Sequence, residues 1–333
     1  MLLDGNLPQS IAQAVDALQR GELVGLPTET VYGLAADACN EAAVAKIFAT
    51  KGRPANHPLI VHVASAAGVP AFAAEVPAFA QRLMAAFWPG PLTLILPRRP
   101  DVGAAAAGGQ NSIGLRCPAH PVALALLKAC AAQGMAGLAA PSANLFGRVS
   151  PTTAAHVQSE LGHELLVLDG GVCAVGIEST IVDCTRGEPV LLRPGQVSRA
   201  QIEVACGLAV LGQDALQAPA PRASGTLESH YAPRAKVRLM SAQDIAAKLL
   251  VLGPHANNLG VWSVQRPGAE DGVGMGAGVV WRAQPLSAEE AAHDLFTVLR
   301  DLDARGVQQI WVQQPPDTPE WEGVRDRLQR AAA

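Results

Sequence analysis

The chain has 333 residues, of which 49% are hydrophobic and 4% aromatic, and its net charge is −4. This length and composition predict about two globular domains with cores built mainly from Ala, Val and Leu. The charge gives no global basic field for nucleic acid, and no apolar stretch approaches the roughly 20 residues that span a bilayer, so a cytoplasmic protein without membrane contact is expected.

The run from Leu23 to Val63 is predicted to fold as strand, helix and strand. Leu23–Leu26 is short and apolar, Asn40 is a helix N-cap, and Gly52 ends the helix before a β-branched strand at 59–63. Such a unit favours a parallel strand pair with a crossover helix, and ligands then bind outside the carboxyl ends of the strands.

Four polar side chains are candidates for that rim, namely Thr28, Thr30, Lys51 and Arg53. An ammonium acts as a point charge and a guanidinium forks onto phosphate or carboxylate, so the pair in KGRP suits anionic oxygens. A solvated basic turn is the alternative, and an isolated KGRP favours it.

The following 150 residues continue the alternation. Helices are expected at 76–88, 121–132 and 152–161, strands at 92–96, 112–116, 138–140, 165–168, 176–183 and 190–193, and a flexible loop at 98–111. Arg53, Arg116 and Arg193 each stand where Gly or Pro ends an element, which together suggests an anion pocket. Ser142 and Asn144 could face a ligand or stabilise their own turn.

From 208 onward the composition becomes that of a linker, rich in Ala, Pro, Gln and Gly. We place domains at 1–207 and 236–333, joined by a linker at 208–235. The ring pair His230 and Tyr231 could cover a base or sugar, or simply pack on its own domain. Four short strands and three helices, one opened by a capping box at Ser287 and Glu290, indicate a smaller C-terminal α/β domain.

Several kinds of catalytic site find no support. The six cysteines form no CxxC pair and have no zinc spacing, so buried free thiols are expected. The sequence contains no HExxH, no Walker lysine loop and no G-x-S-x-G elbow. Metalloprotease and serine hydrolase chemistry are therefore not indicated.

Eight motifs, in order, resemble those of the YrdC-like threonylcarbamoyl-AMP synthases in their long two-domain form. They are PTETVYGL at 27–34, KGRP at 51–54, PLIVHV at 58–63, GLRCP at 114–118, PSAN at 141–144, ESTIVD at 178–183, RPG at 193–195 and HYAP at 230–233. The resemblance implies an α/β fold: a YrdC-like twisted open mixed sheet with flanking helices, and a smaller C-terminal Rossmann-like domain. It also implies that the linker crosses the active site.

The resemblance further implies an enzyme that condenses L-threonine, bicarbonate and ATP, the last with Mg²⁺, into threonylcarbamoyl-AMP and pyrophosphate. The product would pass to a tRNA threonylcarbamoyl transferase for t6A37 modification, with tRNA itself as a further candidate partner. An RNA-binding module for tRNA or double-stranded RNA, without this chemistry, is the alternative. A carbamoyltransferase like part of the hydrogenase maturation proteins is weaker, because their acylphosphatase and zinc-finger regions are missing here.

The site residues carried over from the family fall into three sets. The catalytic residues are Lys51 and Arg53. The L-threonine site comprises Thr28, Thr30, His62, Arg116 and Ser179. The ATP site comprises Lys51, Arg53, His57, Ser112, Ser142, Asn144, Ser150, Arg193 and Tyr231.

Overall fold

The computed structural model describes residues 1–212, 220–225, 230–266 and 278–333. The chain divides into two compact units, the first formed by Met1–Phe146 and Ser150–Thr226 and the second by Gly147–Val149 and Leu227–Ala333. The division falls inside the predicted linker 208–235, of which 213–219 and 226–229 lie outside the described residues. The predicted domain boundaries stay predictions.

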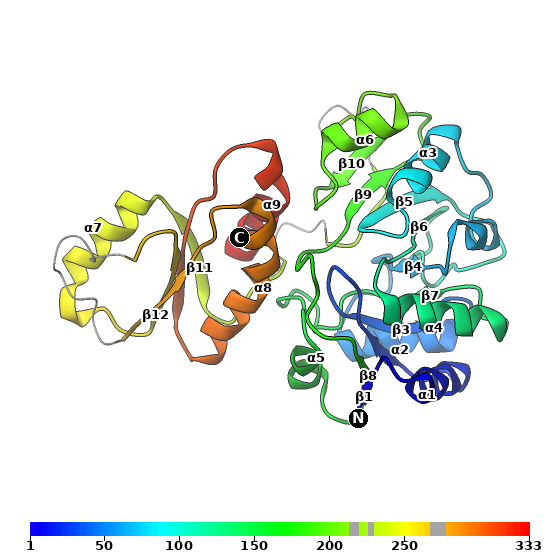
Figure 1. The fold of residues 1–333 in the computed structure, drawn as a ribbon, viewed down its shortest axis with the longest axis horizontal. Coiled ribbons are helices and arrows are strands. Elements are labelled where there is room, and N and C mark those ends of the chain that lie inside the picture. Colours follow the sequence, from blue (N-terminus) through cyan, green and yellow to red (C-terminus); the bar gives the residue numbers. More distant parts are fainter. Residues whose placement is uncertain (213–219, 226–229, 267–277) are drawn as a thin grey trace. The chain divides into compact units, whose positions relative to one another are not determined.

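The first unit is built on a mixed sheet of ten described strands (Figure 1). In spatial order they are β1 (Leu2–Asp4), β8 (Leu166–Asp169), β2 (Val24–Leu26), β3 (Gly33–Asp37), β7 (Leu138–Ala139), β4 (Ile60–His62), β6 (Ser112–Arg116), β5 (Leu92–Pro97), β9 (Thr180–Asp183) and β10 (Val190–Arg193). Strand β4 pairs parallel to β6, which pairs antiparallel to β5. The predicted mixed sheet is confirmed.

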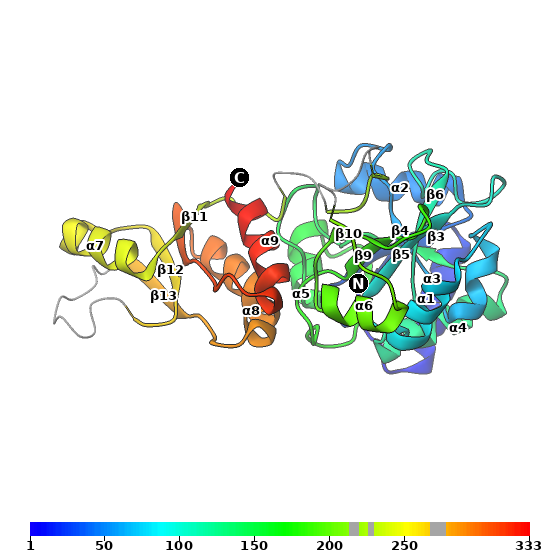
Figure 2. The same cartoon turned by 90° about the horizontal axis from the view of Figure 1, so that it is seen from above.

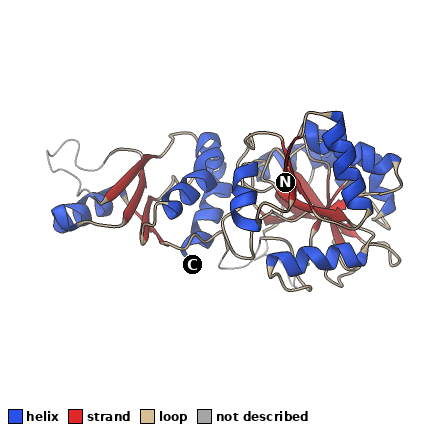
Figure 3. Ribbon diagram, turned by 90° about the horizontal axis from the view of Figure 1, so that it is seen from below, coloured by secondary structure: helices blue, strands red, loops and turns tan. Residues whose placement is uncertain are grey.

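Helices cover both faces of this sheet (Figure 3). They are α1 (Pro8–Gln19), α2 (Glu41–Lys51), α3 (Ala78–Phe87), α4 (Pro121–Ala132), α5 (Ala154–Leu161) and α6 (Arg199–Cys206), with a 3-10 helix at Ala66–Ala71. Helices α1 and α4 pack in one apolar cluster with Ala35, whereas α2, α3 and α6 pack in another with Leu34 and Ala36. Neighbouring residues of a strand face opposite sides, so the two clusters are the cores of the two faces.

The predicted parallel pair of the first strand, helix and strand unit is wrong. Strands β2 and β4 are separated by β3 and β7, and each step from β2 to β3, β7 and β4 is antiparallel. Of the two intervening strands, β3 (Gly33–Asp37) was not predicted, because its sequence GLAAD is short and has no β-branched residue.

Residues 98–111 also differ from the flexible loop expected. They form turns and bends in which Ala106 and Ala107 are fully buried. Their backbone amides bond within the segment, as from Ala107 N to Gly103 O at 2.9 Å. Runs of Ala and Gly lack periodicity, but their small side chains can pack closely where the backbone satisfies its own hydrogen bonds.

Local sequence signals fix both ends of α2. The Asn40 side chain accepts a hydrogen bond from Ala43 N at 3.1 Å, which confirms the predicted N-cap. Gly52 adopts a left-handed φ of 61°, and Arg53 N then reaches Phe48 O at 3.0 Å. Glycine takes this conformation without strain, so the helix stops there with Lys51 in its last turn.

In the second unit, four described strands form a parallel sheet in the order β11-β14-β12-β13. Figure 2 labels β11, β12 and β13 of this sheet. Its elements are β11 (Lys236–Met240), α7 (Ala242–Leu252), β12 (Leu259–Ser263), β13 (Val279–Ala283), α8 (Ala288–Ala304), β14 (Gln309–Gln313) and α9 (Glu322–Ala332), with 3-10 helices at Gly253–His255 and Pro319–Trp321. This is the small Rossmann-like domain expected. None of the described helices in either unit is long and apolar enough to cross a membrane.

The turn after β10 packs closely against the backbone that leads into β9. A Cβ on Gly195 would lie 2.6 Å from Thr180 N and 2.9 Å from Glu178 O, and backbone atoms cannot yield as a side chain does. We therefore expect Gly195→Ala to lower the free energy of unfolding by about 1–3 kcal/mol, measured by urea denaturation. Gly212→Ala is the matched control because only an Arg199 side-chain atom lies within 4.0 Å of that position. Equal stability of the two variants would contradict the close approach.

Candidate active site

The site is organised around the adjacent strands β4 and β6. Their register sets His62 beside Arg116, each at the carboxyl end of its strand. Ile113 and Leu115 belong to the apolar core, so Ser112, Gly114 and Arg116 face the opposite side of the sheet. Both His62 and Arg116 are buried. The paired strands therefore bring together two predicted site residues that come from motifs far apart in the sequence.

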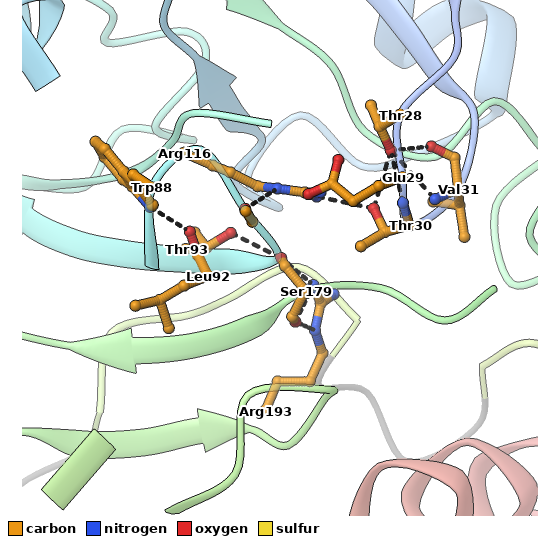
Figure 4. A network of polar contacts seen from close by, with 11 residues as sticks. Thr28, Glu29, Thr30, Val31, Trp88, Leu92, Thr93, Arg116, Ser179 and Arg193 are labelled. Atoms are coloured by element: carbon orange, nitrogen blue, oxygen red, sulfur yellow. Dashed lines mark hydrogen bonds and ion pairs between the residues drawn. The ribbon is translucent and has the colours of Figure 1, made fainter. Parts of the chain in front are cut away.

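Arg116 is held by three groups (Figure 4). Its Nε donates to Gly90 O at 3.2 Å, its Nη1 donates to Thr30 Oγ1 at 2.9 Å, and its Nη2 lies 2.7 Å from Glu29 Oε1. Arg116 is 4% exposed, and the three contacts fix the orientation of its guanidinium. A planar fork held in this way suits a carboxylate ligand.

The loop after β2 carries the two predicted threonines to Arg116. Thr28 Oγ1 donates to Val31 O at 2.5 Å and lies 2.9 Å from Thr30 Oγ1. The backbone amides of Thr30 and Val31 in turn donate to Thr28 Oγ1 at 3.2 Å. Thr28 therefore shapes the turn, and Thr30 makes the direct contact with Arg116.

Ser179 links the sheet to the third predicted arginine (Figure 4). Its Oγ lies 2.7 Å from Thr93 Oγ1, and Arg193 donates from Nη2 to the same Oγ at 3.2 Å. Arg193 also donates from Nε and Nη2 to Ser179 O at 3.0 and 2.9 Å. Ser179 and Arg193 thus form one buried polar cluster next to Thr93 of β5.

Arg193 and Arg53 meet at Ser224, in the described part of the linker. Arg193 Nη1 donates to Ser224 O at 2.7 Å and Arg53 Nη2 donates to Ser224 Oγ at 3.3 Å. Arg53 also donates to Pro58 O at 2.8 Å and lies over the Phe146 ring at 5.7 Å. His57 contacts the edge of that ring, and burial together with Arg53 lowers its pKa. The linker segment 220–225 accordingly borders the site within the first unit.

Lys51 is the first residue of the KGRP motif and is 2% exposed. Its Nζ donates to Ser142 O at 2.6 Å and also to Asn144 O. Burial, and then the nearby charge of Arg53, lower its pKa well below the ordinary lysine value. The solvated basic turn that an isolated KGRP favours is therefore wrong, because Lys51 and Arg53, 6% exposed, are both buried.

The remaining polar candidates fall around these cations. Ser142 and Asn144 belong to the turn that Lys51 binds, and the Asn144 amide donates to Leu145 O at 2.7 Å. Ser150 is fully buried and its Oγ donates to Glu178. Ser112 lines a small hollow together with Ser224. These contacts leave the predicted ATP roles as predictions.

Tyr231 belongs to the second unit. The residue is 1% exposed, and its ring lies 5.4 Å from the Phe296 ring and 5.5 Å from the Arg327 guanidinium. His230 packs edge-on against it at 4.2 Å. The ring pair therefore packs on its own domain, and a role of Tyr231 over a nucleotide remains a prediction.

The titratable groups of the site favour a neutral imidazole and protonated thiols. Burial and the charge of Arg116 lower the pKa of His62 to about 3. Burial raises the pKa of Cys117 and of Cys173, which lie near Glu29 and Arg116. As predicted, the cysteines are free, and they are buried except for Cys39, which is exposed.

Four residues of this network were not predicted: Glu29, Thr93, Glu178 and Ser224. Glu29 and Glu178 stand inside the motifs PTETVYGL and ESTIVD, so their motif positions were the available signal. Thr93 lies between the core residues Leu92 and Leu94, so its side chain faces the other side of the sheet. The register of β5 with β6 shows that this is the face on which Arg116 lies. Ser224 has no sequence signal, since it meets Arg53 across 171 residues.

Comparison with known proteins covers nearly the whole chain. The Sua5/YciO/YrdC family, described as "Telomere recombination", matches residues 16–195, and the domain described as "Threonylcarbamoyl-AMP synthase, C-terminal domain" matches 197–333. Threonylcarbamoyl-AMP synthases of Pyrococcus abyssi and Bacillus subtilis are each 37% identical, covering 96% and 99% of this chain and 93% and 94% of their own lengths.

Solved structures agree with this relationship. A double variant of P. abyssi Sua5 is 33% identical with a TM-score of 0.86, covering 100% of this chain and 96% of its own. P. abyssi Sua5 complexed with L-threonine is 34% identical with a TM-score of 0.84, covering 97% and 94%. Both domain matches and the full-length relatives lead to one conclusion: this chain belongs to the Sua5/YrdC family of threonylcarbamoyl-AMP synthases, in its long two-domain form.

Proposed function

We propose that this chain joins L-threonine, bicarbonate and ATP into threonylcarbamoyl-AMP, with release of pyrophosphate, at the site formed by Lys51, Arg53, Arg116 and Arg193. Its curated relatives named threonylcarbamoyl-AMP synthase match over nearly full length. The relative solved with L-threonine supports that amino acid as the substrate.

The environment of Lys51 is the observation that carries the proposal. Its ammonium is buried and, among the described residues, its contacts are carbonyl oxygens and it has no carboxylate within ion-pair distance. A buried cation without a counter-ion is costly unless a ligand supplies the negative charge. A nucleotide phosphate is the ligand that the proposed reaction brings.

The proposed reaction requires charge stabilisation more than covalent chemistry. The threonine amine adds to bicarbonate, and loss of water leaves the carbamate. The carbamate oxygen then attacks the α-phosphorus of ATP, and pyrophosphate leaves. Lys51, Arg53 and Arg193 would neutralise the charge that develops on the phosphate oxygens. Arg116 would hold the threonine carboxylate, with Thr30, neutral His62 and Ser179 around the amine and hydroxyl.

We propose that Mg²⁺ enters with ATP. The described residues contain no group of three or more His, Cys, Asp or Glu side chains able to hold a metal ion. This fits Mg²⁺, which keeps several waters and binds phosphate oxygens with few protein ligands. Glu178, a buried carboxylate that accepts from Ser150, would hold one of those waters, and the ion would supply further charge neutralisation.

We further propose that the product passes to a tRNA threonylcarbamoyl transferase, which completes the t6A37 modification. ATP and tRNA would both be available to the enzyme in the cytoplasm. Direct tRNA contact would have to come from local cations, since the net charge of the chain is −4.

The reaction itself is tested by omission. Pyrophosphate release from ATP, followed with a coupled phosphate assay, is expected to require both L-threonine and bicarbonate. Release that continues equally when either is omitted would overturn the proposed function.

The role of Lys51 is tested by proton uptake. Because burial lowers its pKa and bound phosphate favours its charged form, ATP binding at about pH 9 should take up protons. The measurement is calorimetry at saturating ATP in buffers of different ionisation enthalpy. Lys51→Met is expected to abolish the uptake and to lower turnover at least about 100-fold.

Arg53→Met is the matched control for this experiment. It also removes a buried cation of the KGRP motif, but arginine does not titrate in this pH range, so proton uptake should persist while turnover falls. Uptake that survives Lys51→Met, or a large loss of thermal stability in place of lost turnover, would show that Lys51 has a structural role.

A further inference from the structure

Glu29 is a buried carboxylate that the proposed reaction does not yet use. It is 8% exposed and lies between Thr28 and Thr30, in the loop that contacts Arg116. Its backbone carbonyl accepts from Val175 N at 2.7 Å, which anchors the residue. Figure 4 shows its side chain directed toward the Arg116 guanidinium.

The contact between Glu29 and Arg116 leaves hydrogen-bonding capacity on both partners. The Oε1 to Nη2 distance is 2.7 Å, but the geometry is that of an ion pair and not of a directed hydrogen bond. Within the described part of the chain, neither oxygen of Glu29 accepts a hydrogen bond. Buried carboxylate oxygens without protein donors are rare, and a ligand bound at Arg116 can supply the missing donor.

The charges of the pair also select the ligand. Arg116 and Glu29 are together neutral, so a second carboxylate placed on Arg116 alone would stand unbalanced beside Glu29. An α-amino acid carries its ammonium on the carbon next to its carboxylate. A zwitterion with its carboxylate on Arg116 and its ammonium toward Glu29 would alternate the four charges and supply the missing donors.

We propose that Glu29 is the receptor for the α-ammonium group of the amino-acid substrate, and that Glu29 and Arg116 together make the site specific for a zwitterion. This rests on the proposed function, because it assumes that L-threonine binds at Arg116. Glu29 is thereby a specificity-determining residue, distinct from the cations that serve the nucleotide.

The experiment compares L-threonine with 3-hydroxybutanoate, which has the same carboxylate and hydroxyl but lacks the amino group. Calorimetric titration of the full-length enzyme should show L-threonine binding about 10- to 100-fold more tightly, as expected for a hydrogen bond to a charged group. Equal affinities for the two ligands would overturn the inference without any variant being made.

The variant Glu29→Gln keeps the size of the side chain and removes its charge. It should weaken L-threonine binding about 10- to 100-fold while leaving 3-hydroxybutanoate binding unchanged or tighter. Equal weakening of both ligands would show that Glu29 only positions Arg116, and unchanged L-threonine binding would also overturn the inference. Glu22→Gln is the control, because this exposed acid pairs with Arg20 away from the site.

The outcomes separate this inference from the function on which it rests. An unmodified enzyme that neither binds L-threonine nor releases pyrophosphate would overturn both. An unmodified enzyme with normal threonine-dependent pyrophosphate release, together with unaltered ligand preference in Glu29→Gln, would overturn the role of Glu29 alone.

Discussion

The burial of Lys51 among carbonyl oxygens is the constraint on which the nucleotide side of the site depends. The ammonium bridges Ser142 O and Asn144 O and so ties the end of α2 to the turn after β7. It lies close enough to Arg53 for the two charges to repel, which helps to lower its pKa. Burial and this repulsion both disfavour the charged form of Lys51, and a bound anionic ligand would favour it.

On the amino-acid side of the site, the charge of the buried cation is compensated by a carboxylate of the protein. Arg116 is as deeply buried as the other cations, but it has Glu29 as a counter-ion at 2.7 Å. Among the described residues, Lys51 on the nucleotide side has no carboxylate within ion-pair distance, whereas Arg116 on the amino-acid side is balanced by Glu29. This division matches the two substrates, because ATP is a polyanion and L-threonine is a zwitterion without net charge.

Local signals in the sequence predicted most of the helices and strands. Asn40 and Gly52 fixed the bounds of α2, and the family motifs supplied Arg116, Ser179 and Arg193. What they could not supply was the sheet order, because the short strand Gly33–Asp37 places β2 and β4 apart. Contacts such as Thr30 with Arg116, 86 residues apart, depend on that order and on strand register.

The chemical state of the site argues for catalysis by charge and position. A thiol nucleophile is disfavoured since burial raises the pKa of both Cys117 and Cys173. His62 is neutral, but the hydroxyls of Thr93 and Ser179 bond to each other, and Arg193 donates to Ser179, so within the described residues neither hydroxyl is paired with His62 as a base.

With nucleophilic routes disfavoured, the buried cations remain as the groups that can lower the barrier. They act on charge that grows during the transfer, and their fixed orientation avoids reorganisation at the moment of reaction. Backbone carbonyls accept hydrogen bonds from Lys51, Arg53 and Arg193 and so fix the orientation of the three cations. Held in this way, the cations can act on the phosphate oxygens of the substrate without first reorienting.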